Sequence, residues 1–378
     1  MRMVLLAHNL RVGGGHVVGM NFIKSLKSVG AEHKFFVIVP AGVGYEELDL
    51  PEESEKYVYQ GGKGLFERWK FDTYQLPKTI REFSPDVILG LGNLGTTSDS
   101  YKQAIVFHYP RAIYSSRHYA NESSKYKVMN WVLKNRIAQC LKYTQLVFCQ
   151  TPVARERFSQ VFKYPTDKIK IMPNAVSKFV QIDKKKAGVP EVLRRTGYYN
   201  LFFLTKYYAH KNLEVLIDIF KDHRELLHDV RCIITVAESQ HRNVHKLLKN
   251  VDKYNLQEHI LNVGVLKQEE LAGYYYNCDA LLFPTLLESF SGTYLEAMHF
   301  GVPIVTSDLD FAHYICKDAA LYFNPWSASD IADKILLLKN NPRLRDRLIE
   351  KGKNQVATIS KSWNEIVSDV MRELERFG

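Results

Sequence analysis

PTLLESFSGTYLEAMHFGVPIVTSD, residues 284–308, combines a turn, a helix and a strand in one short stretch. Apolar periodicity predicts that the helix begins near Gly292 or Thr293, directly after a cluster of small residues. Two glutamates, Glu288 and Glu296, lie eight residues apart around this cluster. Because the first turn of a helix has free N–H groups and the positive end of the helix dipole, the stretch predicts an anion site at the turn.

Short apolar runs alternate with helical patterns along the whole chain. MVLLA, KFFVIVP and QLVFCQT are such runs in the first half, and LFFLT begins a new series in the second. This alternation is typical of parallel βαβ units. The chain has 378 residues, of which 46% are apolar, which is enough for two domains. We therefore predict two doubly wound α/β domains that bind ligands beyond the carboxyl ends of their strands.

The boundary between these domains is predicted in a polar segment, residues 172–199, which has no clear period and suits a linker. We expect an N-terminal Rossmann-like domain over residues 1–176 and a C-terminal one over residues 177–362. Two such domains would face each other across a cleft that holds the ligand.

Positive charge is concentrated in the first half of the chain. Residues 1–175 hold 24 Lys and Arg against 15 Asp and Glu, a net charge of +9, whereas residues 176–378 hold 27 against 26, a net charge of +1. Such a half suggests an anionic partner, which could be nucleic acid, a membrane surface or an acidic substrate.

The most basic stretch of this half, residues 110–144, contains a single acid, Glu122. Its cations are Arg111, Arg117, Lys125, Lys127, Lys134, Arg136 and Lys142. Apolar residues at helical spacing are Met129, Val132, Leu133, Ile137 and Leu141. The pattern fits either a core-facing helix with a basic solvated side or a helix that docks on an anionic membrane surface.

Cysteine usage and hydropathy indicate a cytoplasmic protein. Five widely spaced cysteines without a C-x-x-C pair argue against a disulfide framework and a zinc site. The longest apolar runs are far shorter than the ~20 residues that cross a bilayer. The first of them turns polar at His8, which does not fit a signal peptide.

Two features of the first half lie where a doubly wound domain binds ligands. Gly13, Gly14 and Gly15 separate the first strand from the first helix and would let the backbone approach a ligand closely. His108 ends the apolar strand AIVFHYP. Both also have simpler explanations, because the glycines do not form the dinucleotide motif G-x-G-x-x-G and a lone histidine is often structural.

The second half offers two lysines and two carboxylates near predicted strand ends. Lys206 and Lys211 flank the loop after its first strand, where they could converge on one anionic group or simply be solvated. Glu288 and Glu296 could accept hydrogen bonds from sugar hydroxyls around the anion site, or be a loop acid and a first-turn acid favoured by the dipole.

Two other uses of these carboxylates are disfavoured. The acids of a glycosidase face each other at ~5 to ~9.5 Å, whereas eight helical residues span ~12 Å, so a turn would have to bring Glu288 and Glu296 together. Asp308 and Asp310 form a D-x-D after a strand, but two carboxylates alone are common, and we expect no metal site there.

The sequence resembles a known family over essentially its whole length. ESFSGTYLEAMHFGVPIVTSD resembles the E-x7-E block of family-4 retaining glycosyltransferases, which have the GT-B fold. MPNAVSKF is similar to the P-N-G-V-D segment before the family's linker, and FLTKYYAHKNLEVLI to its basic strand–loop–helix. Residues 363–378 resemble the C-terminal helix that crosses back onto the first domain.

The resemblance implies a role for each candidate residue. Glu288 would bind the transferred sugar, Glu296 the ribose of the nucleotide, Lys206 and Lys211 the diphosphate, and His108 the donor sugar near its reacting carbon. Of these, all but Glu296 would be catalytic. The remaining implied donor-binding residues are Gly14, Gly15, Val265, Ser291, Gly292 and Thr293.

As a whole, the resemblance implies a retaining hexosyltransferase that needs no metal or cofactor. It would transfer a sugar from a UDP- or GDP-sugar to a lipid-linked or polysaccharide acceptor of the O-antigen, capsule or exopolysaccharide type. The enzyme would work in the cytoplasm or on the inner face of the membrane. A nucleotide-sugar 2-epimerase on the same scaffold remains an alternative. A nucleic-acid-binding protein is disfavoured, because no zinc, RNP or helix-turn-helix signature is present.

Overall fold

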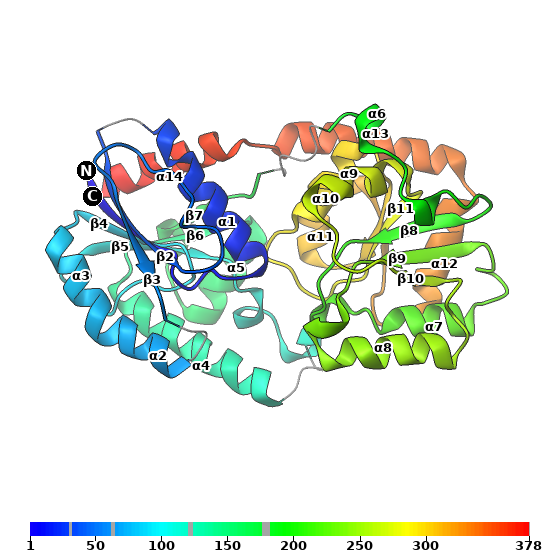
Figure 1. The fold of residues 1–378 in the computed structure, drawn as a ribbon, viewed down its shortest axis with the longest axis horizontal. Helices are drawn as coiled ribbons and strands as arrows, with labels where there is room; N and C mark the ends of the chain where they lie inside the picture. The colour runs from blue at the N-terminus through cyan, green and yellow to red at the C-terminus, as the bar shows by residue number, and fades with distance from the viewer. Residues whose placement is uncertain (30–31, 62–64, 120–123, 176–181, 378) are drawn as a thin grey trace. The chain divides into compact units, whose positions relative to one another are not determined.

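The structure, a computed structural model, describes residues 1–29, 32–61, 65–119, 124–175 and 182–377. The chain divides into two compact units, which we describe one at a time (Figure 1). Unit 1 comprises residues 1–114, 123–175 and 361–378, and unit 2 comprises residues 115–122 and 176–360. The boundary predicted at residues 176 and 177 lies outside the described residues, and the predicted cleft stays a prediction.

Unit 1 is built on a seven-stranded parallel sheet with the order β3-β2-β1-β4-β5-β6-β7. Its strands are β1 (Arg2–Leu6), β2 (Lys34–Pro40), β3 (Glu55–Tyr59), β4 (Val87–Gly90), β5 (Lys102–Phe107), β6 (Leu146–Cys149) and β7 (Ile169–Ile171). Its α-helices are α1 (Gly13–Lys24), α2 (Leu65–Lys70), α3 (Leu76–Phe83), α4 (Ser124–Cys140), α5 (Pro152–Phe162) and α14 (Trp363–Phe377). A π-helical turn, η2 (Phe71–Gln75), joins α2 to α3.

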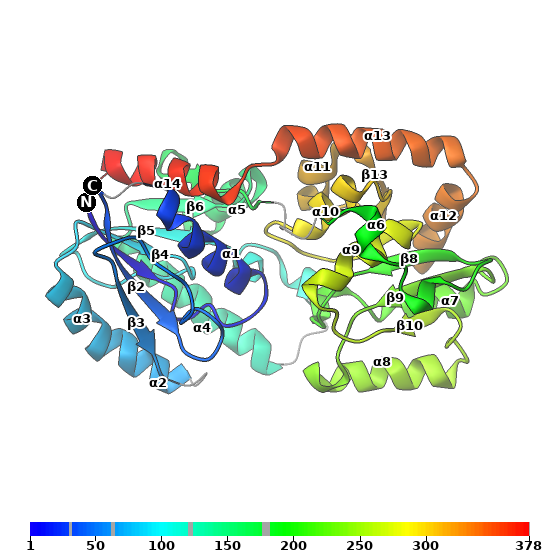
Figure 2. The same cartoon turned by 45° about the horizontal axis from the view of Figure 1, so that its top comes forward.

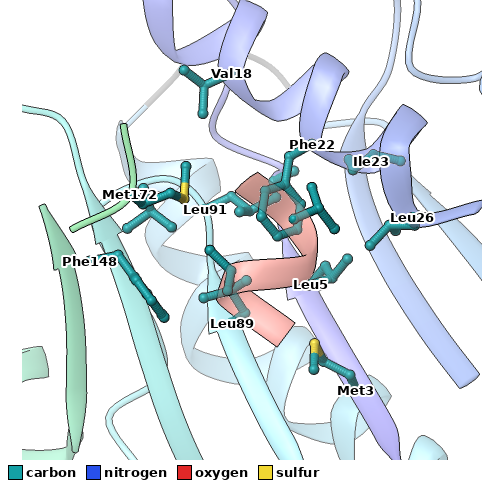
Figure 3. Packing of buried hydrophobic residues seen from close by; sticks show 14 of the residues in the cluster. Met3, Leu5, Val18, Phe22, Ile23, Leu26, Leu89, Leu91, Phe148 and Met172 are labelled. Carbon is teal, nitrogen blue, oxygen red and sulfur yellow. The ribbon is translucent and has the colours of Figure 1, made fainter. Parts of the chain in front are cut away.

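Both faces of this sheet are covered, which explains why its central strands are continuously apolar. Met3 and Leu5 of β1 point into a core formed with α1 and α14 (Figure 3). The alternate residues Val4 and Leu6 pack on the opposite face against residues of η2 and α3 such as Ile80. The period of two along a strand therefore distributes one apolar run between two cores.

The C-terminal helix α14 is part of the unit 1 core, although the helix before it, α13 (Pro342–Ile359), belongs to unit 2. Figure 2 shows α14 over the same face of the sheet as α1. Its buried residues follow a helical period and are Ile366, Val367, Val370, Met371 and Leu374. Fully burying an aliphatic side chain contributes roughly 1.5–3 kcal/mol, so α14 stabilises unit 1 substantially.

Unit 2 contains a six-stranded parallel sheet with the order β10-β9-β8-β11-β12-β13. Its strands are β8 (Tyr199–Phe203), β9 (Val230–Ile234), β10 (Ile260–Asn262), β11 (Ala280–Phe283), β12 (Ile304–Ser307) and β13 (Ala320–Phe323). Its other α-helices are α6 (Lys184–Ala187), α7 (Val215–Asp222), α8 (Arg242–Lys253), α9 (Gln268–Asn277), α10 (Gly292–Phe300), α11 (Asp310–Cys316) and α12 (Ala328–Lys339).

The two sheets confirm the predicted pair of doubly wound domains and fix where each can bind a ligand. Strand order reverses between β8 and β11 in unit 2 and between β1 and β4 in unit 1. At such a switch point the connections leave in opposite directions, so the carboxyl ends of the two strands stay accessible. In the described part of the chain, no helix is long and apolar enough to cross a membrane.

Candidate functional site

The switch point of unit 2 brings two sequence-distant loops together. Lys206 and Lys211 lie in the loop after β8, which ends in a short 3-10 turn, η9 (Ala209–Lys211). Glu288 lies in the loop after β11. The loops are joined because the Leu286 backbone N–H donates to the His210 carbonyl over 2.7 Å.

Lys211 and Glu288 form a mostly buried ion pair at this position. The Lys211 Nζ donates to Glu288 Oε1 over 2.5 Å, and the two side chains are only 14% and 12% exposed. The Thr285 hydroxyl donates to the same carboxylate oxygen over 3.0 Å. The Lys211 ammonium also lies 4.7 Å from the centre of the Phe283 ring, within range of a cation–π interaction. The pair therefore has the hydrogen bonds that a desolvated charge requires.

The two predicted lysines differ in their surroundings. Lys206 is exposed, whereas Lys211 is held by Glu288. The hypothesis that both lysines converge on one anionic group stays a prediction. Lys211 is oriented by the protein, and Lys206 supplies a solvated charge.

The residue after Lys206 anchors the loop, and no sequence pattern predicts this role. The Tyr207 backbone N–H donates to the Gln240 side chain over 3.0 Å, and its hydroxyl donates to the Glu214 carboxylate. Asn243 donates to the same hydroxyl over 2.9 Å. Because Tyr207 is 7% exposed and held at both ends, the backbone beside Lys206 is fixed although the lysine side chain is solvated.

Helix α10 begins at Gly292, as the sequence predicted, directly after the Glu288 loop. Ser291 is buried at the N-cap position, but its side chain makes no capping hydrogen bond. Gly292 and Thr293 are partly exposed in the first turn. The first-turn N–H groups of α10 thus lack a side-chain cap, which leaves them suited to an anion.

Glu296 lies deeper in the unit than the sequence predicted. It is the fifth residue of α10, no acid lies in the first turn, and its side chain is only 6% exposed. The explanation as a surface acid favoured by the helix dipole is therefore wrong. The Tyr275 hydroxyl donates to Glu296 Oε2 over 2.9 Å. Burial, and then the Glu296 charge, raise the pKa of Tyr275 well above its usual value, so this hydroxyl keeps its proton.

The last predicted donor residue of unit 2, Val265, is 58% exposed in the loop after β10. The Asn262 side chain shapes this loop by accepting hydrogen bonds from the backbone N–H groups of Val236 and Gly264, over 3.1 and 3.2 Å. Gly264 has φ +76°, a left-handed conformation that favours glycine. Val265 is thus accessible in the loop after β10.

Unit 1 brings the glycine loop and His108 together at the carboxyl edge of its own sheet. Gly13 has φ +69° and begins α1. An ideal Cβ on Gly15 would lie 3.0 Å from His108 Nε2 and 3.1 Å from Leu10 Cδ2, whereas one on Gly14 would meet nothing within 4 Å. Gly15 therefore permits the histidine to pack directly against the start of α1.

His108 is held as a neutral imidazole. Its backbone N–H donates to Asn93 Oδ1 over 2.8 Å, which fixes the end of β5. The buried Nδ1 atom has no hydrogen-bond partner in the described part of the chain. Burial lowers the pKa of His108 to about 4, because the charged form would be desolvated.

The D-x-D carboxylates do not share a binding position. Asp308 pairs with His313 over 2.5 Å, and Asp310 accepts from the Phe311 backbone N–H over 2.9 Å. Within the described ranges, the one cluster of His, Cys, Asp and Glu with the spacing of metal ligands is Glu32, His33 and Glu375 of unit 1. That cluster is already accounted for by the pairing of His33 with Glu375 over 3.1 Å.

Comparison with known proteins assigns unit 2 to a family. Residues 186–355 match the sequence model of the family described as Glycosyl transferases group 1. Unit 2 thus resembles a group 1 glycosyltransferase domain over most of its length. The predicted resemblance is thereby confirmed at the level of group 1, and the finer assignment to family 4 stays a prediction.

Relatives and solved structures extend the similarity beyond the residues that match this family model. An uncharacterized glycosyltransferase of Methanocaldococcus jannaschii is 29% identical over 57% of this chain and 62% of its own. A phosphatidyl-myo-inositol mannosyltransferase of Mycobacterium leprae is 28% identical over 46% of each chain. The Anabaena protein Alr3699/HepE, solved with UDP and glucose, has TM-score 0.74 and 14% identity over 100% of both chains. The fold of both units is thus that of GT-B glycosyltransferases, while this chain spans about three fifths of the first relative's length.

We predict that Gly15→Ala lowers the melting temperature relative to Gly14→Ala. Alanine in a helix is favoured over glycine by up to ~1 kcal/mol, a gain open to both variants. Only the new Cβ at position 15 would crowd the His108 ring. Thermal unfolding followed by circular dichroism measures the difference, and equal melting temperatures would contradict the packing described.

We also predict that His108→Gln reduces the fall in the free energy of unfolding of unit 1 as the pH is lowered. Between pH 6.5 and about 4, His108 is protonated in the unfolded chain but stays neutral in the folded one, because its pKa is lower there. The free energy of unfolding of the wild type therefore falls by about 3 kcal/mol over this window because of His108, and the variant lacks that loss. Denaturant titrations at several pH values test this, with the exposed His245→Gln as control. Parallel pH curves for wild type and His108→Gln would refute it.

Proposed function

We propose that the protein is a retaining glycosyltransferase that moves a hexose-type sugar from a nucleotide diphosphate sugar to a lipid-linked or polysaccharide acceptor. The observation that carries this proposal is the Lys211–Glu288 pair at the switch point of unit 2, next to the uncapped start of α10. It places a cation, a carboxylate and free N–H groups where one ligand with phosphates and hydroxyls would need all three.

Each group then has a role in donor binding. Glu288 accepts hydrogen bonds from hydroxyls of the transferred sugar, and the Glu296 carboxylate accepts from the ribose. Lys211, Lys206 and the first-turn N–H groups of α10 hold the diphosphate. Val265, in the exposed loop after β10, contacts the base, which is that of UDP or GDP.

Charge changes during the reaction explain why such a site accelerates it. As the bond between the sugar and the diphosphate breaks, the sugar becomes positive and the leaving phosphate becomes more negative. Lys211 is already oriented by Glu288, so it stabilises this growing charge without reorganising. The leaving phosphate takes the proton of the acceptor hydroxyl, and retention follows when the acceptor attacks from the same face. In this mechanism the lysines take the place of a metal ion.

The neutral His108 and the glycine loop of unit 1 suit the sugar rather than the phosphates. A neutral imidazole can donate or accept one hydrogen bond per nitrogen without adding charge beside a developing oxocarbenium ion. Gly14, with open space around its Cα, lets a hydroxyl or phosphate reach the backbone at the start of α1.

The relatives support the class of donor and acceptor. The mannosyltransferase of Mycobacterium leprae is named for a lipid acceptor, phosphatidyl-myo-inositol, and the Anabaena protein was solved with UDP and glucose. We infer a role in cell-surface polysaccharide or glycolipid synthesis, with catalysis at the inner face of the cell membrane.

A donor assay tests the proposal directly. The protein is incubated with UDP-glucose, UDP-N-acetylglucosamine and GDP-mannose, with and without a membrane lipid extract. We expect one donor to release its nucleotide diphosphate in an extract-dependent way, and the product to keep the anomeric configuration by NMR. Conversion of the donor to its 2-epimer without extract would show an epimerase instead, and inversion would refute the retaining mechanism.

A second test substitutes each of the two lysines and distinguishes an effect on catalysis from an effect on folding stability. Lys211→Ala should reduce kcat by about 30- to 1000-fold, the rate equivalent of roughly 2–4 kcal/mol, and should also lower the melting temperature because Glu288 is left buried without its partner. Lys206→Ala should reduce kcat but leave the melting temperature unchanged, because its side chain is solvated.

Lys249→Ala is the matched control for these variants, since Lys249 is an exposed lysine of the same unit. Lys339 is unsuitable as a control, because it pairs with Asp229. Steady-state kinetics and thermal unfolding give both readouts. Near-normal turnover of both Lys206→Ala and Lys211→Ala would exclude the diphosphate role.

Tyr275 provides a test of the ribose role of Glu296. Tyr275→Phe removes the donor that holds Glu296 Oε2, so we expect the affinity for UDP or GDP, whichever binds the wild type, to fall roughly 3- to 10-fold. The preference for the ribonucleotide over its 2′-deoxy and 3′-deoxy analogues should shrink as well. Calorimetric titration measures both quantities.

Tyr276→Phe is the control, because the Tyr276 hydroxyl donates to the Ile182 carbonyl over 3.2 Å and does not reach Glu296. An equal loss of affinity for the ribose and deoxy nucleotides in Tyr275→Phe would show that Tyr275 acts only on the stability of unit 2.

A further inference from the structure

Helix α4 of unit 1 exposes apolar side chains that the helical pattern did not predict. Of the predicted core stripe, Ile137 and Leu141 are buried, but Met129 is 37% exposed. The exposed aromatic and apolar residues of α4 are Tyr126 (43%), Val128 (60%), Met129 (37%) and Trp131 (67%). Apart from Asn130, the buried residues of α4 lie in its second half, so most of its first half, including these apolar side chains, is exposed to solvent.

The charges of this helix all have one sign. No acidic residue occurs between Ser124 and Cys140. Lys125, Lys127 and Lys134 are exposed. Arg136 is the exception among the cations of α4, because it donates to Asp72 of η2 over 2.7 Å.

The Arg136–Asp72 pair links α4 to a second group of exposed aromatic residues. Trp69 of α2 is 46% exposed and Tyr74 of η2 is 63% exposed, and their rings meet edge to face at 5.9 Å. Figures 1 and 2 both show α2 and α4 side by side on one flank of unit 1. We define the aromatic patch as Trp69, Tyr74, Tyr126, Val128, Met129 and Trp131.

We propose that the aromatic patch and the lysines of α4 dock unit 1 on an anionic membrane surface. Tryptophan and tyrosine suit the interface between head groups and acyl chains, because the ring is apolar and carries one polar atom. Val128 and Met129 gain by entering the acyl layer, and each nearby lysine adds attraction to anionic lipid. The proposal rests on the proposed function only in that a lipid-linked acceptor would be presented there.

Charge and shape favour a membrane over the two other possible occupants. In a twofold-symmetric contact between two copies, the same patch meets itself, so the lysines of α4 would face like charges. A nucleic acid would use the cations and aromatic rings but would gain nothing from Val128 and Met129. A membrane uses all three kinds of side chain.

Vesicle binding by the full-length protein tests the proposal without donor or acceptor. We expect sedimentation with vesicles of phosphatidylcholine and phosphatidylglycerol at low salt, and little with phosphatidylcholine alone or at high salt. The double variant Lys125→Gln/Lys127→Gln should bind about tenfold more weakly. Trp131→Ser should also weaken binding. Addition of vesicles should shift wild-type fluorescence to the blue, and should shift that of Trp131→Phe, which keeps Trp69, by a smaller amount.

Matched controls come from unit 2. Trp326→Ser removes a tryptophan that is 41% exposed, and Lys184→Gln/Lys185→Gln removes two exposed lysines, so both should bind like the wild type. All substituted side chains are exposed, although Trp326 also contacts Arg117 and His118, and unchanged melting temperatures will show that folding is intact. Because the assay needs no turnover, loss of binding with intact glycosyl transfer separates this proposal from the proposed function.

Three results would overturn the proposal. The first is the absence of sedimentation with anionic vesicles at low salt. The second is equal binding by the α4 variants and the wild type. The third is another occupant, shown either by a duplex or single-stranded oligonucleotide that binds at physiological salt and competes with vesicles, or by a dimer that Trp131→Ser dissociates.

Discussion

The ion pair between Lys211 and Glu288 is the interaction on which the candidate site depends. Neighbouring parallel strands β8 and β11 carry connections that leave in opposite directions, so their loops can meet. A desolvated lysine or glutamate without its partner would lower the free energy of unfolding. The pair therefore holds the two loops in a fixed position relative to one another. The Thr285 hydroxyl donates to the same carboxylate oxygen as the lysine, so it further restrains the Glu288 side chain. The start of α10 follows directly, so its position is set by the same constraint.

The carboxyl edge of the sheet in unit 1 carries a neutral histidine and glycines, in contrast to the charged residues in unit 2. Its histidine is kept neutral by burial, and its glycines leave room for a ligand rather than supplying charge. The basic character of unit 1 lies elsewhere, and part of it lies on α4, where it accompanies exposed aromatic residues.

The sequence predicted features set by local pattern and missed those set by tertiary contacts. Buried strands such as β1 and β2 are continuous apolar runs, whereas the edge strand β3 is polar and half-buried and was not recognised. The start of α10 was predicted because small residues precede apolar periodicity. The partners Tyr275 and Tyr207 could not be found, since neither spacing nor composition shows which carboxylate a distant hydroxyl will meet. The apolar residues of α4 have the spacing of a helix face, but only the packing of the folded unit decides how far along the helix the core extends.

A double-mutant cycle on Lys211 and Glu288 measures the central interaction most directly. Lys211→Met, Glu288→Gln and the double variant are unfolded in denaturant, and the free energy of unfolding of unit 2 is compared with the wild type. The account predicts a coupling of about 1–3 kcal/mol, with the double variant more stable than the sum of the single losses implies, because it leaves no unpaired charge. It also predicts that none of the three variants binds a nucleotide diphosphate sugar as tightly as the wild type. Additive losses, or wild-type donor affinity in the double variant, would contradict it.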